Sequence, residues 1–134
     1  MAFVTPEQAE LAWLGAERAL LVRGRDVVAA TQPHTLRELY REQGVVIPEG
    51  TEIPPVVVRV LGPAGAQGGA AGRVRWALEP GDRLALLSKD LGEIAPEEVA
   101  RRASEGALGE ALGRVKGALV PRFPRAVAAV LAEV

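Results

Sequence analysis

The chain has 134 residues, hydrophobic residues at 49% of its positions and a formal net charge of −1. A chain of this length forms one domain with a real core, and its near-neutral charge argues against nucleic acid or a membrane surface as partners. No apolar run reaches the roughly 20 residues of a membrane span and the N-terminus lacks a signal-peptide pattern, so we expect a cytoplasmic protein. The absence of cysteine excludes disulfides and thiol chemistry.

Antiparallel strands are predicted in the N-terminal part. Residues 10–14 and 18–23 have strand patterns on either side of a Gly-Ala-Glu turn, and Gly24-Arg25 forms a hairpin turn into a strand over 26–31. A short helix is predicted within 35–44. Thr35 and Glu38 make its capping box, and Gly44 ends it.

The middle of the chain predicts a proline-rich loop followed by two strands. The loop covers 45–55, the strands cover 56–61 and 73–78, and a glycine-rich segment, 62–72, joins them. A phosphate-binding loop would continue into a helix with a Lys-Ser/Thr pair. Segment 62–72 enters a strand instead, so we interpret it as a hairpin connection.

The last third predicts a central strand, two helices and a final strand. Residues 83–88 are apolar on both faces, which is typical of a central strand. Helices are expected over 96–104, where a proline opens the first turn, and over 107–119. Residues 124–133 favour a strand, although their alanines leave a helix open. The predicted fold class is α+β, an antiparallel sheet with this helical pair on one face.

Three glycines recur at every fourth position of the second predicted helix: Gly109, Gly113 and Gly117. Each costs up to about 1 kcal/mol relative to alanine in a helix. We expect close backbone packing against another element of the chain to compensate for that cost, and a helix–helix dimer is the alternative.

Few residues carry the chemistry of a common active site. His34 is the single histidine, which argues against zinc and favours a structural role near a helix start. No serine has a histidine and an acid in a triad-like context. The only aspartates are Asp26, Asp82 and Asp90, too few for a two-metal hydrolytic centre.

Taken in order, the segments resemble the PPM-type (protein phosphatase 2C-like) metal-dependent serine/threonine phosphatases. "LAWLGAERALLVRGRDVVAATQPHTLRELYREQG" is similar to the family's strand, Gly-Asp-Ser-Arg turn, hairpin and helix. "VVVRVLG" is similar to its Leu-Gly segment, "LEPGDRLALLSKDLGEIAPEEV" to its Pro-Gly-Asp strand and Ser-Asp-Gly-Leu loop, and "PRAVAAVLAEV" to its Asp-Asn strand. The resemblance implies a single half-domain over 1–134, half of a phosphatase-like β-sandwich that matches the second half of the family's domain.

The resemblance also implies that the metal site has been lost. The acid of the Gly-Asp-Ser-Arg turn corresponds to Ala16, and the metal ligand of the Ser-Asp-Gly loop corresponds to Lys89. Glu93 matches a further acid of that loop, and Pro124 stands at the ligand of the Asp-Asn strand. Arg18, Ser88 and Leu91 are retained. The first-half metal motif and the phosphate-binding arginine have no counterpart.

We therefore expect no catalysis, no bound metal and no cofactor, but a binding, scaffold or regulatory role. The alternatives are a phosphatase-like subunit completed by a partner chain, an enzyme of another type, and a small oligomerisation module. Because the resembled sandwich has two sheets, we expect one apolar face of the sheet to stay uncovered and to form a homodimer or bind a protein partner. The alternative is that the N-terminal strand and loop 45–55 cover that face in a monomer.

Overall fold

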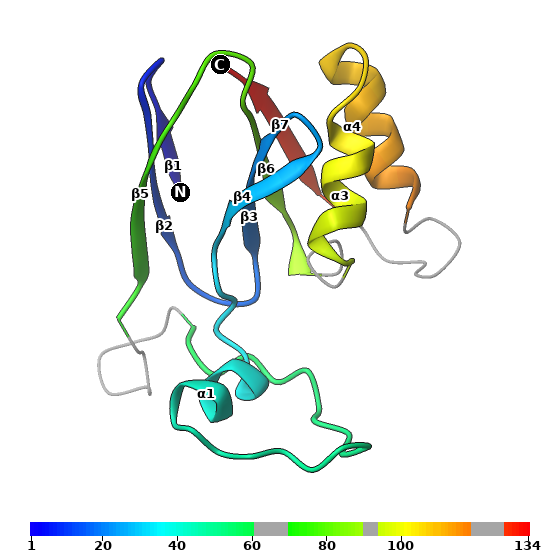
Figure 1. Cartoon of the computed structure of the whole chain (residues 1–134). Helices are drawn as coiled ribbons and strands as arrows, with labels where there is room; N and C mark the ends of the chain where they lie inside the picture. The colour runs from blue at the N-terminus through cyan, green and yellow to red at the C-terminus, as the bar shows by residue number, and fades with distance from the viewer. Residues whose placement is uncertain (61–69, 90–93, 119–127) are drawn as a thin grey trace.

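The computed structural model describes residues 1–60, 70–89, 94–118 and 128–134. Figure 1 shows two sheets and a pair of helices side by side, with a further helix below them. The strands are β1 (Ala2–Val4), β2 (Gln8–Trp13), β3 (Arg18–Arg23), β4 (Asp26–Ala30), β5 (Gly72–Ala77), β6 (Arg83–Leu87) and β7 (Ala129–Glu133). The helices are α1 (Leu36–Glu42), α3 (Pro96–Ala103) and α4 (Leu108–Gly117). None of these helices is long and apolar enough to cross a membrane.

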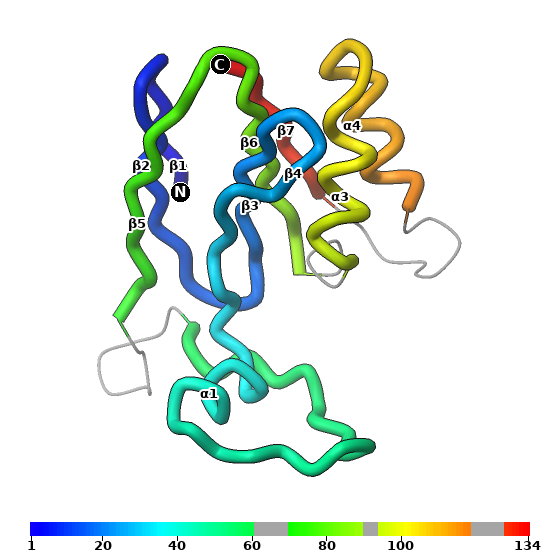
Figure 2. Tube along the Cα trace, in the orientation of Figure 1, coloured from blue at the N-terminus to red at the C-terminus, as the bar shows by residue number. Residues whose placement is uncertain are grey.

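All strand pairings are antiparallel. One sheet has three strands in the order β1-β2-β5, and the other has four strands in the order β4-β3-β6-β7. The tube in Figure 2 shows that β3 leads directly into β4 through a tight turn, where Gly24 has a φ of +58°. Glycine adopts this left-handed backbone at little cost, which explains the predicted hairpin.

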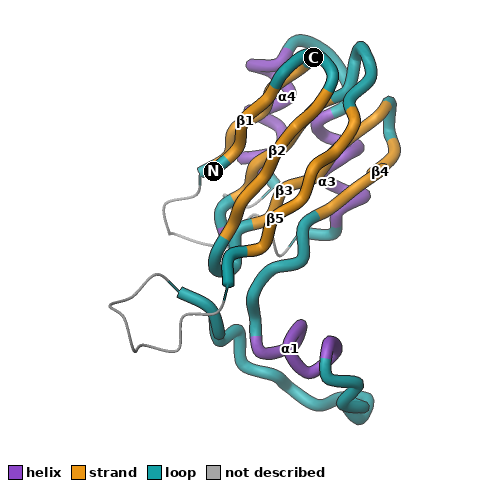
Figure 3. Tube along the Cα trace, turned by 90° about the vertical axis from the view of Figure 1, so that its left-hand side faces the viewer, coloured by secondary structure: helices purple, strands orange, loops and turns teal. Residues whose placement is uncertain are grey.

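The four-stranded sheet is covered on both faces. Toward α3 and α4 it contributes one apolar cluster, made of Leu20, Val22, Ala85, Leu87, Val99, Ala100, Ala103 and Val115. Toward the three-stranded sheet it contributes to a second cluster, made of Ala9, Leu11, Ala19, Leu21, Trp76, Leu78 and Leu84. Figure 1 shows the resulting layers side by side, in the order three-stranded sheet, four-stranded sheet, helices, and Figure 3 shows them face on, with the three-stranded sheet in front. The α+β prediction, with the helical pair on one face, is confirmed.

The position of β6 follows from its lack of polar alternation. Leu84, Ala85 and Leu87 are all buried, because the strand lies between β3 and β7 and between two layers. The predicted central strand is therefore confirmed. The final strand is confirmed over Ala129–Glu133, and residues 124–127 of that prediction lie outside the described residues.

One predicted strand is wrong. Residues 56–60 form no strand and make a single antiparallel bridge, between Val57 and Thr35, while residue 61 lies outside the described residues. The Leu36 amide donates to the Val56 carbonyl (2.9 Å), and the Val58 amide donates to the His34 carbonyl (2.9 Å). An isolated bridge to the start of α1 thus replaces the sheet partner that a run of valines predicts from propensity alone.

The expected packing role of the glycines on α4 is also wrong. Gly109, Gly113 and Gly117 are exposed, and a Cβ built on any of them would meet nothing within 4 Å. The helix buries Ala111 and Val115 instead. The glycine spacing matches one helical face, but that face points away from the core. The helix–helix dimer stays a prediction.

The assembly prediction requires the second face of the four-stranded sheet to stay open, but this face is covered. The same chain covers it with β2 and β5, so that premise for a dimer is wrong. The alternative is right about the N-terminal strands and wrong about loop 45–55, because β5 rather than that loop completes the cover. Self-association remains a prediction without this support.

Candidate functional site

A cleft lies at one end of the sandwich, between the four-stranded sheet and α1. It has a volume of about 440 Å³. Its walls come from the loop after β2, the start of β3, the first turn of α1, the prolines at 54 and 55, the residue that follows Ser88, and the start of α3. Segments that are far apart in the sequence therefore meet here, at the carboxyl end of β6.

Two of the four positions that the resemblance singles out line this cleft together. Ala16 is 7% exposed and presents only a methyl group. The Lys89 ammonium donates a hydrogen bond to the Pro55 carbonyl at 3.2 Å, which holds the lysine against the proline loop. The other two positions, Glu93 and Pro124, lie outside the described residues.

The described residues of the cleft do not fit a divalent metal ion. Such ions need several carboxylate, carbonyl or imidazole ligands that converge on one point. Here the two matched positions offer a methyl group and an ammonium. Over residues 1–60, 70–89, 94–118 and 128–134, no three histidine, aspartate or glutamate side chains come together as a potential metal site.

His34 fastens the loop that carries Ala16. The imidazole is buried, its Nδ1 accepts a hydrogen bond from the Gly15 amide (3.3 Å), and the ring stacks on Trp13 with centroids 5.8 Å apart. The Gly15 carbonyl in turn accepts from the His34 amide at 2.7 Å. Burial, with the nearby Arg59 charge, lowers the pKa of His34. These contacts give His34 the structural role that its position predicts.

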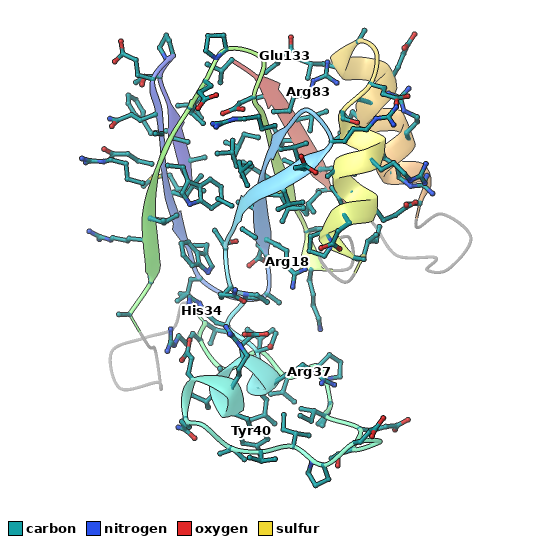
Figure 4. All side chains as sticks on the ribbon, viewed as in Figure 1. Arg18, His34, Arg37, Tyr40, Arg83 and Glu133 are labelled. Carbon is teal, nitrogen blue, oxygen red and sulfur yellow. The ribbon has the colours of Figure 1, made fainter. Side chains whose placement is uncertain are left out.

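Arg18 and Arg37 add two guanidinium groups to the cleft, from β3 and α1 (Figure 4). Neither makes a hydrogen bond or an ion pair with any residue in the described parts of the chain. The nearby Glu38 carboxylate is bonded to Arg41 at 2.7 Å. The resemblance identifies Arg18 as a retained residue, but nothing in the sequence indicates Arg37, because the chain path between β4 and α1 decides where it lies.

A buried carboxylate, that of Asp82, lies at the opposite end of β3. Asp82 is 1% exposed and accepts two hydrogen bonds from the Arg23 guanidinium, at 2.8 and 2.9 Å. Its carboxylate also accepts from the Glu79 amide at 2.9 Å. The Arg23 hydrogen bonds hold the pKa of Asp82 below its usual range. The predicted turn residue is thus a structural acid that ties two strands together.

A second cavity, of about 310 Å³, opens between the two sheets at the side where β1 and β7 are edge strands. Its lining is mostly apolar and includes Met1, Leu11, Leu86 and Val130. Val130 is 57% exposed. Arg18 lines both this cavity and the cleft between the four-stranded sheet and α1.

The layered fold is that of part of a PPM-type serine/threonine phosphatase domain. The serine/threonine phosphatase PstP/Ppp of Mycobacterium tuberculosis superposes with a TM-score of 0.81 at 19% identity, over 99% of this chain and 57% of the phosphatase. Stp1 of Staphylococcus aureus gives 0.80 at 21% identity, over 99% and 54%. PppA, a key regulatory component of T6SS in Pseudomonas aeruginosa, gives 0.72 at 18% identity, over 92% and 51%.

The chain therefore spans little more than half the length of these solved phosphatases. A structure of PstP in complex with two manganese ions also matches, with a TM-score of 0.69 at 18% identity, over 98% of this chain and 56% of that one. No protein-family model matches the sequence, and no curated protein matches it. The likeness to the phosphatases concerns the fold, and the chemistry depends on the residues of the cleft.

Proposed function

We propose that this chain is a phosphatase-like binding module, with a scaffold or regulatory role, that does not itself catalyse metal-dependent hydrolysis. The observation that carries the proposal is the composition of the cleft. Ala16 and Lys89 both line it, at positions where the resembled phosphatases have acids. A metal site would need carboxylates there, and an ammonium in their place repels a cation.

The replacement also removes the means of activating water. In metal-dependent hydrolysis the ion lowers the pKa of bound water and stabilises charge on the reacting oxygens. An ammonium offers one charge and donates hydrogen bonds, but it does not produce a metal-bound hydroxide. The fold alone does not supply that chemistry.

Metal content and turnover test this proposal together. The purified protein should hold no stoichiometric manganese or magnesium by elemental analysis and should cleave neither a chromogenic phosphate ester nor a phosphoserine peptide. A known metal-dependent phosphatase assayed alongside validates the conditions. Lys89→Asp alone should remain inactive, because Ala16 still lacks a carboxylate. Two metals per chain with metal-dependent turnover would overturn the proposal.

A second candidate function is supported by the cavity between the sheets. Its apolar lining and the edge strands β1 and β7 make that side suitable for another chain that would complete the sandwich. A second copy of this chain is the simplest occupant. A protein with this role is a subunit, and its activity depends on the assembly.

Sedimentation equilibrium at micromolar concentration tests the second candidate. A dimer mass for the native chain and a monomer mass for Val130→Asp would support it, because Val130 is exposed on β7 in the cavity wall. The matched control is Val28→Asp, which places the same charge on β4 at the other edge of the four-stranded sheet, where Val28 is 47% exposed. A monomer mass for the native chain would contradict self-association.

A further inference from the structure

His34 connects two parts of the chain at the end of the sandwich that holds the cleft. Its backbone lies between the end of β4 and the start of α1 (Figure 4), and its ring faces Gly15 in the loop between β2 and β3. The Gly15 amide donates to Nδ1 of His34 (3.3 Å), and the His34 amide donates to the Gly15 carbonyl (2.7 Å). One of these two bonds therefore ends on a nitrogen that takes up a proton in the range of mildly acidic pH.

The bond between the Gly15 amide and Nδ1 exists only while the imidazole is neutral. A neutral imidazole accepts at one nitrogen and donates at the other, so an acceptor at Nδ1 places the ring proton on Nε2. An imidazolium donates at both nitrogens, and its Nδ1–H would point at the Gly15 N–H. Two facing donors form no bond, so protonation breaks this contact and leaves a buried amide without its acceptor.

The stacking of His34 on Trp13 determines which side of the contact moves. The two rings have centroids 5.8 Å apart and an interplanar angle of 16°. Because a cation is attracted to the face of an indole, this stacking persists when the imidazole is protonated. The Trp13 Nε1 also donates to the Gln32 carbonyl at 2.8 Å, which ties the indole to the segment that leads into His34. The Gly15 amide is therefore the group that separates from the ring.

We propose that His34 is a pH-sensitive switch: the neutral ring holds the loop between β2 and β3, and the protonated ring releases it. This loop carries Ala16, which lines the cleft. Release therefore changes the wall of the cleft, while the two sheets stay folded through their own strand pairing. The inference goes beyond the proposed function and does not depend on what the cleft binds.

The surroundings of the ring set the pH at which the loop is released. Burial lowers the pKa of His34 and is the largest influence. Among the described residues, Arg59 in segment 56–60 lowers this pKa further, while Glu42 of α1 and Glu17 of the loop raise it. Since the unfolded chain takes up the proton first, the stabilisation is complete above the ordinary histidine pKa of about 6.5 and is lost as the pH falls from there to the folded value. The loss of the acceptor at Nδ1 does not depend on these charges.

Nuclear magnetic resonance on the full chain tests the switch between pH 7.5 and pH 4.5. His34 is the single histidine, so its ring signals are unambiguous. We expect it to titrate with a pKa below 6.5, and the hydrogen-exchange protection factor of the Gly15 amide to fall at least tenfold as the ring is protonated. The Ala19 amide is the matched control within the molecule. It donates to the Thr31 hydroxyl at 2.8 Å, which does not titrate, and should keep its protection.

The variant His34→Asn separates the loss of the acceptor from other effects of acid. The Asn Oδ1 takes the place of Nδ1 and accepts from the Gly15 amide without titrating. The protection factor of this amide should therefore change less than twofold over the same pH range. Thermal unfolding verifies that the variant is folded, and the titration of the native chain decides the inference if it is not.

Four results would overturn the inference. The first is a pKa of His34 at or above 6.5 in the folded chain, and the second is a Gly15 protection factor that does not change as the ring is protonated. The third is an equal loss of protection at Gly15 and Ala19, which would mean that the whole chain unfolds. The fourth is a folded His34→Asn variant that loses Gly15 protection in acid as the native chain does. Each of these leaves the proposed function standing, since that proposal fails on metal-dependent turnover.

Discussion

Arg83 and Glu133, at one end of the sandwich, form an ion pair, whereas the guanidinium groups of Arg18 and Arg37, at the other end, have no partner among the described residues (Figure 4). Arg83 donates to the Glu133 carboxylate and to the carbonyls of Ala103 and Gly106, each at 2.7 Å. It thereby joins β6 to β7 and to the connection between α3 and α4. No contact of this kind fixes Arg18 or Arg37 in the described residues.

The difference is clearest along β3, which has an arginine at each end. Arg23 is bound by Asp82 and by Glu79, whose carboxylate accepts at 2.6 Å. Arg18 points into a cleft without an acidic partner among the described residues. An arginine with buried acceptors stabilises the fold, while one without them remains available to a ligand. The paired end therefore accounts for stability, and the unpaired end is where binding is expected.

Replacing Asp82 should have the largest effect, because it removes the centre of the paired end. Asp82→Ala leaves the Glu79 amide and the Arg23 guanidinium without their buried acceptor, and we expect a loss of about 2 kcal/mol in the free energy of unfolding. Urea unfolding followed by circular dichroism at pH 7 measures it. Asp26→Ala, in an exposed hairpin position, should change the value by less than about 0.5 kcal/mol.

We also expect the gap in unfolding free energy between the native protein and Asp82→Ala to depend on pH. The Arg23 hydrogen bonds lower the pKa of Asp82 in the folded state, so its contribution is complete above the ordinary aspartate pKa of about 4 and is lost as the pH falls through the lower folded value. The gap between the native protein and Asp82→Ala should therefore narrow below about pH 4. The pKa of Glu98 is lowered by Arg101 and Arg102, but Glu98 is present in both proteins, so its contribution cancels in the gap between them. A gap that stayed constant down to pH 2 would contradict the assignment.

A smaller loss in the free energy of unfolding is expected for a packing change at the unpaired end. A Cβ on Gly72 would lie 2.4 Å from the Trp13 ring, whose Nε1 donates to the Gln32 carbonyl at 2.8 Å. Gly72→Ala should therefore cost about 1.5 kcal/mol, since the indole must move. Gly113→Ala is the control and should stabilise by up to about 1 kcal/mol, because nothing lies near its Cβ. Equal changes in unfolding free energy for Gly72→Ala and Gly113→Ala would show that the Trp13 ring moves aside at no cost.

Sequence patterns predict the elements of this fold well where burial and local chemistry agree. The apolar run that became β6, the hairpin at Gly24 and the cap at Thr35, whose side chain accepts from the Glu38 amide, are all local signals. The predicted strand over 56–61 fails because a strand needs a partner, which local propensity does not supply. The packing prediction for the glycines of α4 is wrong for a related reason: their spacing defines one face of the helix but not what covers that face.

The candidate site is only partly predictable. Lys89 and Ala16 come from the resemblance, and the structure brings both to one cleft. Arg37 could not be found in the sequence, because its place depends on how the segment after β4 turns beneath the sheets. Asp82 appears as a turn residue, and its burial depends on Arg23, which is 59 positions away. Long-range pairing decides which charges are used by the fold and which remain for a ligand.

The smallest expected change in stability separates the two arginines of β3. Arg18→Gln should alter the free energy of unfolding by no more than about 0.5 kcal/mol, because no hydrogen bond of Arg18 in the described residues is lost. Arg23→Gln should lower stability clearly, because it breaks the contacts with Asp82 and Glu79. Urea unfolding of both variants beside the native protein measures this contrast. Equal losses of unfolding free energy in Arg18→Gln and Arg23→Gln would show that the contacts of Arg23 with Asp82 and Glu79 add no stability of their own.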